Sequence, residues 1–242
     1  MAGSAAGMSR PDVAADCSLL QKPIPELRVS DLREVHKTLK YVKATAEAHI
    51  RISPVPLEKM NLVPYSDASW ANAPGMKSQA SLLVMCTSTD VLEKTCPASI
   101  LEWKSHRLQR AVRSTLAAEA AALDAANDHA GFLGCLMSEL FWADYRATEA
   151  RESRIKVTPV TDCKSLYDAV HRLATNFQDK RTQIDVTALR QSARFLRWVP
   201  THLQLADVFT KRDAKLRNAF RQFMLDPRIC LIETSGPERE SG

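Results

Sequence analysis

Residues 61–71 read NLVPYSDASWA, an apolar stretch rich in β-forming residues that leads to the turn residues Pro74 and Gly75. Two more apolar runs follow after short links, SLLVMCTS at residues 81–88 and SILEWKSH at residues 99–106. Three consecutive strands joined by short links predict an antiparallel meander. The first strand also carries an aspartate, Asp67, among its apolar residues.

Helical and extended patterns alternate after the meander. A long helix is predicted over residues 114–141, where Leu116, Leu123, Ala130, Leu133, Met137 and Leu140 keep helical spacing. A strand over 155–162, helices over 163–173 and 179–195, a fifth strand over 195–202 and a closing helix over 205–225 follow. The second of these helices is expected to turn Ile184, Val186, Leu189 and Ala193 inward. This order predicts an α/β fold with a five-stranded mixed sheet, three antiparallel strands first, flanked by helices.

The ends of the chain differ in character from this body. The N-terminal segment combines prolines with Ala, Ser and Gly and has no sustained period, which is typical of a disordered arm. A helix capped by Ser30 follows, and Pro54 and Pro56 end it. The expected division is a disordered arm over 1–29, a helical segment over 30–59, the main domain over 60–226 and a solvated tail over 227–242.

Composition excludes several classes of protein. Apolar runs are interrupted by charge well before membrane-spanning length, so no membrane segment is expected. The first residues lack the basic cluster and apolar stretch of a secretory signal, so we expect an intracellular protein, cytoplasmic or nuclear. The 6 cysteines form no CxxC pair and have no histidines clustered beside them, which argues against a structural zinc site or a disulfide framework.

Basic residues are concentrated in one short segment. The net charge is only +5, but five basic or titratable side chains crowd into ten residues, namely Lys104, His106, Arg107, Arg110 and Arg113. Such a cluster suits a polyanion such as nucleic acid. A solvated basic surface is the alternative.

Two acidic residues fall where a carboxylate is costly. Asp67 lies in an apolar strand, and Glu119 lies three residues after Leu116 and four before Leu123, on the helix stripe that faces the sheet. A buried ionised carboxylate needs a cation, dense hydrogen bonding or a shifted pKa. The alternatives are a strand-end aspartate and a helix-start glutamate that the macrodipole favours.

Two further aspartates stand at the ends of predicted elements. Asp162 ends the fourth strand, where helix capping alone would explain it, and Asp207 lies in the first turn of the last helix, where the helix dipole favours negative charge. The constellation is more informative than its members, because these elements would lie side by side in a mixed sheet. Clustered carboxylates without Cys or His select Mg²⁺ or Mn²⁺. Two such ions about 4 Å apart are typical of metal nucleases.

Four segments in order resemble the ribonuclease H domain of copia-type retrotransposon polyproteins. They are YSDASWA (65–71), WKSHRLQRAVRSTLAAEA (103–120), TDCKSL (161–166) and WVPTHLQLADVFTK (198–211), similar to that family's YSDADWA, its serine-rich turn before EAE, and its QLADxxTK. The resemblance covers about residues 60–215. The segment DLREVHKTLKYVKATAEAHI (31–50) also resembles the last helix of a reverse transcriptase thumb. A ribonuclease H-like fold from a retrotransposon reverse transcriptase is therefore implied.

The resemblance implies roles for particular residues. Its metal-binding carboxylates fall on Asp67, Glu119, Asp162 and Asp207, which would hold two Mg²⁺ ions, with Mn²⁺ as the alternative. The phrase WVPTH also resembles the WVPxH strand of retroviral and cellular ribonucleases H, whose histidine assists proton transfer or product release; it maps onto His202. In those relatives a longer loop precedes the last aspartate, so a surface or capping histidine is the alternative.

The implied activity is that of an endonuclease, a phosphodiester hydrolase, that cleaves the RNA strand of an RNA–DNA hybrid. No small-molecule cofactor is expected. The phosphate contacts would come from Lys104, Arg107, Arg110, Arg113, Lys164 and Lys211. The alternatives are a catalytically silent nucleic-acid-binding remnant of the same fold and a transposase-like DNA nuclease.

The chain departs from the family in two ways. It reads RTQID at residues 181–185, where family members often carry Lys-His-Ile-Asp, so a basic contact to substrate is expected to be reduced. It also contains no YxDD motif of a polymerase palm. We therefore expect a fragment of a polyprotein, with a separate reverse transcriptase polymerase region as a partner.

Overall fold

A computed structural model describes residues 6–21, 26–73, 77–149, 152–172 and 179–232. Within them the chain forms a mixed sheet in the order β6-β5-β1-β2-β3-β7, with β4 paired beside β1. The predicted turn at Pro74 and Gly75 lies outside the described residues. The predicted meander is confirmed as β1 (Met60–Ala73), β2 (Lys77–Ser88) and β3 (Cys96–Arg107). The other strands are β4 (Lys156–Val157), β5 (Val160–Thr161), β6 (Arg197–Trp198) and β7 (Arg228–Ile229).

The mixed α/β class is confirmed, but the expectation of five strands is wrong, since the sheet has seven. The predicted strand over 155–162 divides into β4 and β5 around Thr158 and Pro159. Proline has no N–H to donate to a strand ladder, which accounts for the break. The seventh strand, β7, pairs antiparallel with β3 inside the expected tail.

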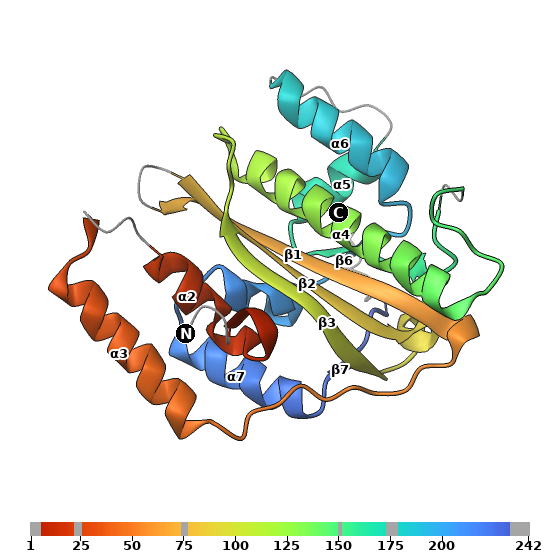
Figure 1. Cartoon of the computed structure of the whole chain (residues 1–242). Helices are drawn as coiled ribbons and strands as arrows, with labels where there is room; N and C mark the ends of the chain where they lie inside the picture. Colours follow the sequence, from red (N-terminus) through yellow and green to blue (C-terminus); the bar gives the residue numbers. More distant parts are fainter. Residues whose placement is uncertain (1–5, 22–25, 74–76, 150–151, 173–178, 233–242) are drawn as a thin grey trace, which may run out of the picture.

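Helices cover both faces of the sheet (Figure 1). On one face lie α4 (Thr115–Phe141), α5 (Lys164–His171) and α6 (Lys180–Ser192), whose apolar residues pack together beside β1 and β2. The other face is covered by the 3₁₀ helix η6 (Leu205–Phe209) and by α7 (Ala214–Leu225) and α2 (Ala14–Leu20), with α3 (Val29–Ala44) outside them. Shorter 3₁₀ turns are η1 (Pro11–Val13), η3 (Leu57–Lys59), η4 (Thr89–Leu92) and η5 (Thr201–Leu203).

The N-terminal segment is part of the core, so the expectation of a disordered arm is wrong for residues 6–21. Val13 and Ala14 are buried, and the Trp103 indole donates a hydrogen bond of 2.6 Å to the Ala6 carbonyl. Buried Asp16 forms ion pairs with Arg217 at 2.7 Å and with Arg212. These contacts are tertiary, which explains why a short Ala- and Ser-rich sequence without a period gave no signal for them.

Other predicted helix boundaries needed correction. Helix α3 begins at Val29, with Arg28 as its N-cap residue in place of Ser30. The predicted closing helix divides into η6 and α7, because the Asp213 carboxylate accepts the backbone N–H groups of the first turn of α7. Of the four residues predicted to face inward from helix α6 and its C-cap, Val186, Leu189 and Ala193 are buried, whereas Ile184 is 66% exposed.

Two glycines in α4 give opposite predictions. A Cβ on Gly134 would lie 2.7 Å from Ser153 Oγ and 3.0 Å from Ser153 Cβ, whereas one on Gly131 would meet nothing within 4 Å. We expect Gly131→Ala to raise the free energy of unfolding by about 0.5–1 kcal/mol, because glycine is a poor helix former. Gly134→Ala should lower it by about 1–3 kcal/mol through overpacking. Urea denaturation measures both; equal shifts would contradict the packing of α4 on the loop at Ser153.

Candidate active site

The four predicted carboxylates come from four elements around the end of β1. Asp67 lies on β1 and is only 6% exposed. Because side chains alternate along a strand, it shares a face with Val63 and Tyr65, which belong to the core beneath η6 and α7. Its carboxylate accepts a hydrogen bond from the Thr210 hydroxyl. Asp67 is therefore a buried aspartate facing η6.

Glu119 reaches the same region from α4. Alanines at the start of this helix pack on alanines of β1 and β2, with Ala118 and Ala122 among them against Ala68. Such small side chains allow a helix to approach a sheet closely. Glu119 is 6% exposed, its carboxylate accepts a hydrogen bond from the Ala68 backbone, and its Oε2 atom has no partner. The prediction that it faces the sheet is confirmed.

The other two aspartates lie in positions that capping does not explain. Asp162 follows β5, but the N-cap residue of α5 is Cys163, and the side chain of Asp162 instead accepts a hydrogen bond of 3.2 Å from Gln204 Nε2. Asp207 lies in η6 and not in the first turn of the last helix. It is 8% exposed, pairs with Lys211 Nζ through Oδ2 at 2.7 Å, and has no partner for buried Oδ1.

Burial and mutual repulsion shift the pKa values in this cluster. Burial raises the pKa of Asp67 to about 6, and the charges of Asp207 and Asp162 add to the rise while the Thr210 and Lys211 contacts oppose it. Burial also raises the pKa of Glu119 to about 9, with further contributions from Asp67, Asp162 and Asp207. Asp67 and Glu119 thus both respond to the charges of Asp162 and Asp207, so the four side chains share one electrostatic neighbourhood.

Lys211 partly neutralises this neighbourhood. Burial lowers the pKa of its ammonium, but the hydrogen bond to Asp207 and the charges of Asp67, Asp207 and Asp162 raise it overall. Lys211 is one cation beside four acidic side chains, so further positive charge would favour their ionised forms.

The donor chemistry fits a divalent cation, although a coordination shell is not assembled. Oε2 of Glu119 and Oδ1 of Asp207 are buried carboxylate oxygens without partners, and oxygen donors of this kind suit Mg²⁺. Within the described part of the chain, however, no three acidic, His or Cys side chains converge closely enough to hold a metal ion as a group. Support for a metal therefore comes from buried carboxyl oxygens without partners and not from preformed geometry.

His202 is the fifth residue predicted for the site. It lies in η5 and is exposed, and among the described residues no hydrogen bond or ion pair joins its side chain to any of the four acids. Its expected role in proton transfer or product release stays a prediction.

The predicted phosphate-binding residues do not form one surface. Lys104 pairs across the sheet with Leu82, which packs toward α4, so Lys104 lies on the α4 face. Arg107 pairs with Gln79, whose side chain bonds Ser18 of α2, and donates to the Gln21 carbonyl, so it lies on the opposite face. Three of the six predicted residues are engaged in ion pairs: Arg110 with Asp185, Lys164 with Asp168, and Lys211 with Asp207. Arg113 is exposed in the loop before α4. The basic cluster of the sequence is thus divided between the two faces.

Two polar residues of the site were not assigned roles from the sequence. Gln204 and Thr210 are buried and contact Asp162 and Asp67, respectively. Both flank Asp207 at three-residue intervals within the otherwise apolar stretch 205–209. That spacing, which matches the period of a 3₁₀ helix, is the signal that could have identified them.

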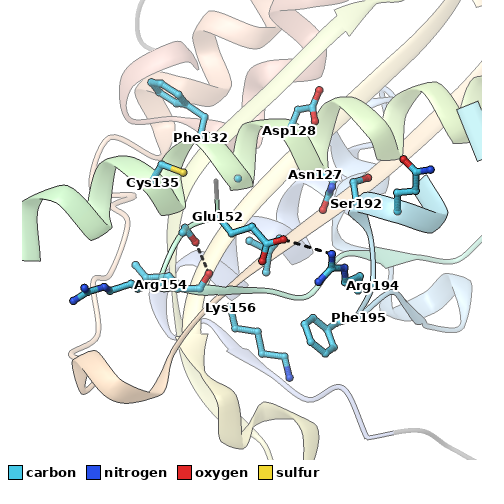
Figure 2. A pocket seen from close by; sticks show the side chains of 15 residues that line it. Asn127, Asp128, Phe132, Cys135, Glu152, Arg154, Lys156, Ser192, Arg194 and Phe195 are labelled. Carbon is cyan, nitrogen blue, oxygen red and sulfur yellow. Dashed lines mark hydrogen bonds and ion pairs between the residues drawn. The ribbon is translucent and has the colours of Figure 1, made fainter. Parts of the chain in front are cut away.

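A separate cavity of about 720 Å³ lies toward the C-terminal half of α4 (Figure 2). Asn127 and Phe132 of α4 line it, together with Lys156 of β4 and with Arg194 and Phe195 after α6. Lys156 Nζ lies 4.4 Å from the centre of the Phe195 ring, and Arg194 pairs with Glu152. Acidic and basic side chains nearly balance around it, so its charge favours neither anions nor cations.

No protein-family model matches the chain, and no curated protein sequence matches it. Solved structures similar to it include the following three. LC11-RNase H1 in complex with an RNA/DNA hybrid is 15% identical over 68% of this chain and 99% of that chain, with a TM-score of 0.34. The native prototype foamy virus protease-reverse transcriptase is 12% identical over 72% of this chain and 22% of that chain, with a TM-score of 0.31.

The third structure is the foamy viral protease-reverse transcriptase in complex with an RNA/DNA hybrid. It is 14% identical over 84% of this chain and 28% of that chain, with a TM-score of 0.30. Similarities this weak assign neither a family nor an activity to the chain, so any assignment depends on the carboxylates and their surroundings. No helix among the described residues is long and apolar enough to cross a membrane.

Proposed function

We propose that this chain is a ribonuclease H-type endonuclease of retrotransposon origin that uses divalent metal ions to cleave the RNA strand of an RNA–DNA hybrid. The observation that carries the proposal is the convergence of Asp67, Glu119, Asp162 and Asp207 from β1, α4, the end of β5 and η6. A fold gains nothing from burying three acidic side chains beside a fourth that is half-buried, which suggests that they serve a ligand. The motifs that resemble copia-type ribonucleases H carry the same four residues.

The carboxylates would hold the cations, Mg²⁺ first and Mn²⁺ as the alternative. When bound, the two ions supply an activated water and neutralise charge on the leaving oxygen of the phosphodiester. Glu119 and Asp207 each offer a buried oxygen without a partner for this purpose. Binding of metal would also offset the burial and the repulsion that raise the pKa values of Asp67 and Glu119.

Basic residues near the site would bind the phosphates of the hybrid. Lys211, beside Asp207, would contact a substrate phosphate, and Arg113, exposed in the loop before α4, would supply a second phosphate contact. The RNA strand would be recognised through its 2′-hydroxyl groups and groove shape, without preference for base sequence. A polymerase region on a separate chain would deliver the hybrid.

Cleavage of a labelled RNA–DNA hybrid by the full chain tests the proposal. We expect cleavage of the RNA strand with Mg²⁺ and none with EDTA. Hybrid that binds with steep salt dependence but stays uncut would instead indicate a catalytically silent binding remnant. Equal or faster cleavage of duplex DNA would indicate a DNA nuclease.

A further inference from the structure

One short turn of the chain contacts two of the four carboxylates, Asp67 and Asp162, and carries a third, Asp207. Gln204 is the N-cap residue of η6, Asp207 lies within η6, and Thr210 is its C-cap residue. In a 3₁₀ helix, side chains three residues apart lie one above the other. Gln204, Asp207 and Thr210 therefore project from the same edge of η6, toward the carboxylates of Asp67 and Asp162.

Gln204 joins three parts of the site. It is 5% exposed, and its Nε2 group donates to Asp162 Oδ1 at 3.2 Å and to the Ser66 carbonyl of β1 at 2.9 Å. Its Oε1 atom accepts from the backbone N–H of Ala206 at 3.2 Å. An amide uses both of its functions here, which fixes its orientation and, with it, one oxygen of Asp162.

Thr210 holds the opposite side of the cluster. It is 1% exposed, and its hydroxyl lies against the Asp67 carboxylate and 3.2 Å from the Asp207 carbonyl. A hydroxyl has a single proton, and the ionised carboxylate is the stronger acceptor. The bond to Asp67 thus ties β1 to the residue that ends η6.

We propose that Gln204 and Thr210 are positioning residues that set the spacing of the metal-binding carboxylates: Gln204 orients Asp162, Thr210 orients Asp67, and the 3₁₀ turn between them carries Asp207. This inference rests on the proposed function. It explains why polar residues stand at both ends of an apolar turn, where a purely structural turn would need neither a carboxylate contact nor burial. Both residues act through the carboxylates and need not touch substrate.

Isosteric variants test the proposal with Mg²⁺ binding by calorimetry on the full chain. Thr210→Val keeps the shape but removes the donor, and Gln204→Glu keeps the acceptor for Ala206 but replaces the donor that faces Asp162 with a repelling oxygen. We expect each to weaken Mg²⁺ affinity by about 10- to 100-fold, the usual effect of losing a group that orients a metal ligand. Thr210→Ser, which keeps the hydroxyl, should restore affinity close to that of the wild type.

Controls separate positioning from folding. Thr187→Val removes an exposed hydroxyl on α6 that bonds only the Gln183 carbonyl, and it should leave Mg²⁺ affinity unchanged. A double-mutant cycle of Thr210→Val with Asp67→Asn on thermal unfolding without metal should show coupling between the two side chains. Absence of coupling, or wild-type Mg²⁺ affinity in Thr210→Val, would overturn the positioning role alone. A wild-type chain that binds no Mg²⁺ would overturn the proposed function together with it.

Discussion

Asp67→Asn should reduce Mg²⁺-dependent cleavage of an RNA–DNA hybrid by more than about 100-fold, because loss of a group that merely orients a metal ligand already costs 10- to 100-fold. The substitution keeps the size of the side chain and removes its negative charge. Asp67 is buried beside Thr210, Asp207 and Lys211, so no solvent-exposed acid can take its place. Initial cleavage rates at saturating Mg²⁺ measure the loss.

The matched control is Asp144→Asn. Asp144 is exposed and pairs with Arg154 outside the carboxylate cluster, and exposed ion pairs contribute little to stability. Its cleavage rate should equal that of the wild type. Unchanged cleavage in Asp67→Asn, with the chain folded, would remove Asp67 from the proposed catalytic set and leave the silent binding remnant as the better hypothesis.

The sequence predicted the fold best where patterns were long. The meander and α4 were predicted because a run of alternating or helical apolar residues extends over ten residues or more. Two-residue strands such as β7 carry no such pattern, and they form only because a neighbouring strand is already in place. The N-terminal residues 6–21 are likewise ordered by tertiary contacts, such as the ion pair of Asp16 with Arg217.

The site was predictable as a set of acids but not as a geometry. Asp67 and Glu119 stood out because a carboxylate in an apolar pattern is costly, and their burial is confirmed. Asp162 and Asp207 had capping as an alternative explanation until the structure assigned Cys163 as the N-cap residue of α5 and placed Asp207 in η6. Lys104 and Arg107 diverge because β3 continues to Arg107, one residue beyond the predicted strand, and side chains three residues apart on a strand lie on opposite faces.

The metal-free chain should lose stability as pH rises, and Glu119 should be a principal cause. Its pKa is about 9 in the folded chain and 4.5 when unperturbed. Between these values the folded state binds a proton that the unfolded state has released, so the free energy of unfolding falls with pH, by at most about 1.4 kcal/mol per pH unit. This destabilisation by Glu119 is absent below about pH 4.5, grows as the pH rises, and is complete above about pH 9.

Glu119→Gln should remove this pH-dependent loss of stability. The amide has nearly the shape of the carboxyl group, cannot ionise, and brings an N–H donor toward Asp67 and Asp162, whose charges raise the pKa of the wild-type residue. At pH 8 in EDTA the variant should be more stable than the wild type by on the order of 3 kcal/mol, with a flatter pH profile. Urea denaturation from pH 5 to pH 9 measures both quantities.

Glu139→Gln supplies the comparison on the same helix, because Glu139 is exposed near the end of α4 and should leave the pH profile unchanged. Stabilisation by Mg²⁺ provides a second measurement. Mg²⁺ should stabilise the wild type more than Glu119→Gln, since a ligand that binds only the folded state stabilises it more the more tightly it binds. A variant that is stabilised in EDTA yet loses both cleavage and the response to Mg²⁺ would show that the fold retains Glu119 at a cost in stability for the sake of its ligand. Equal pH profiles for Glu119→Gln and the wild type would contradict the buried, ionisable Glu119 on which that interpretation depends.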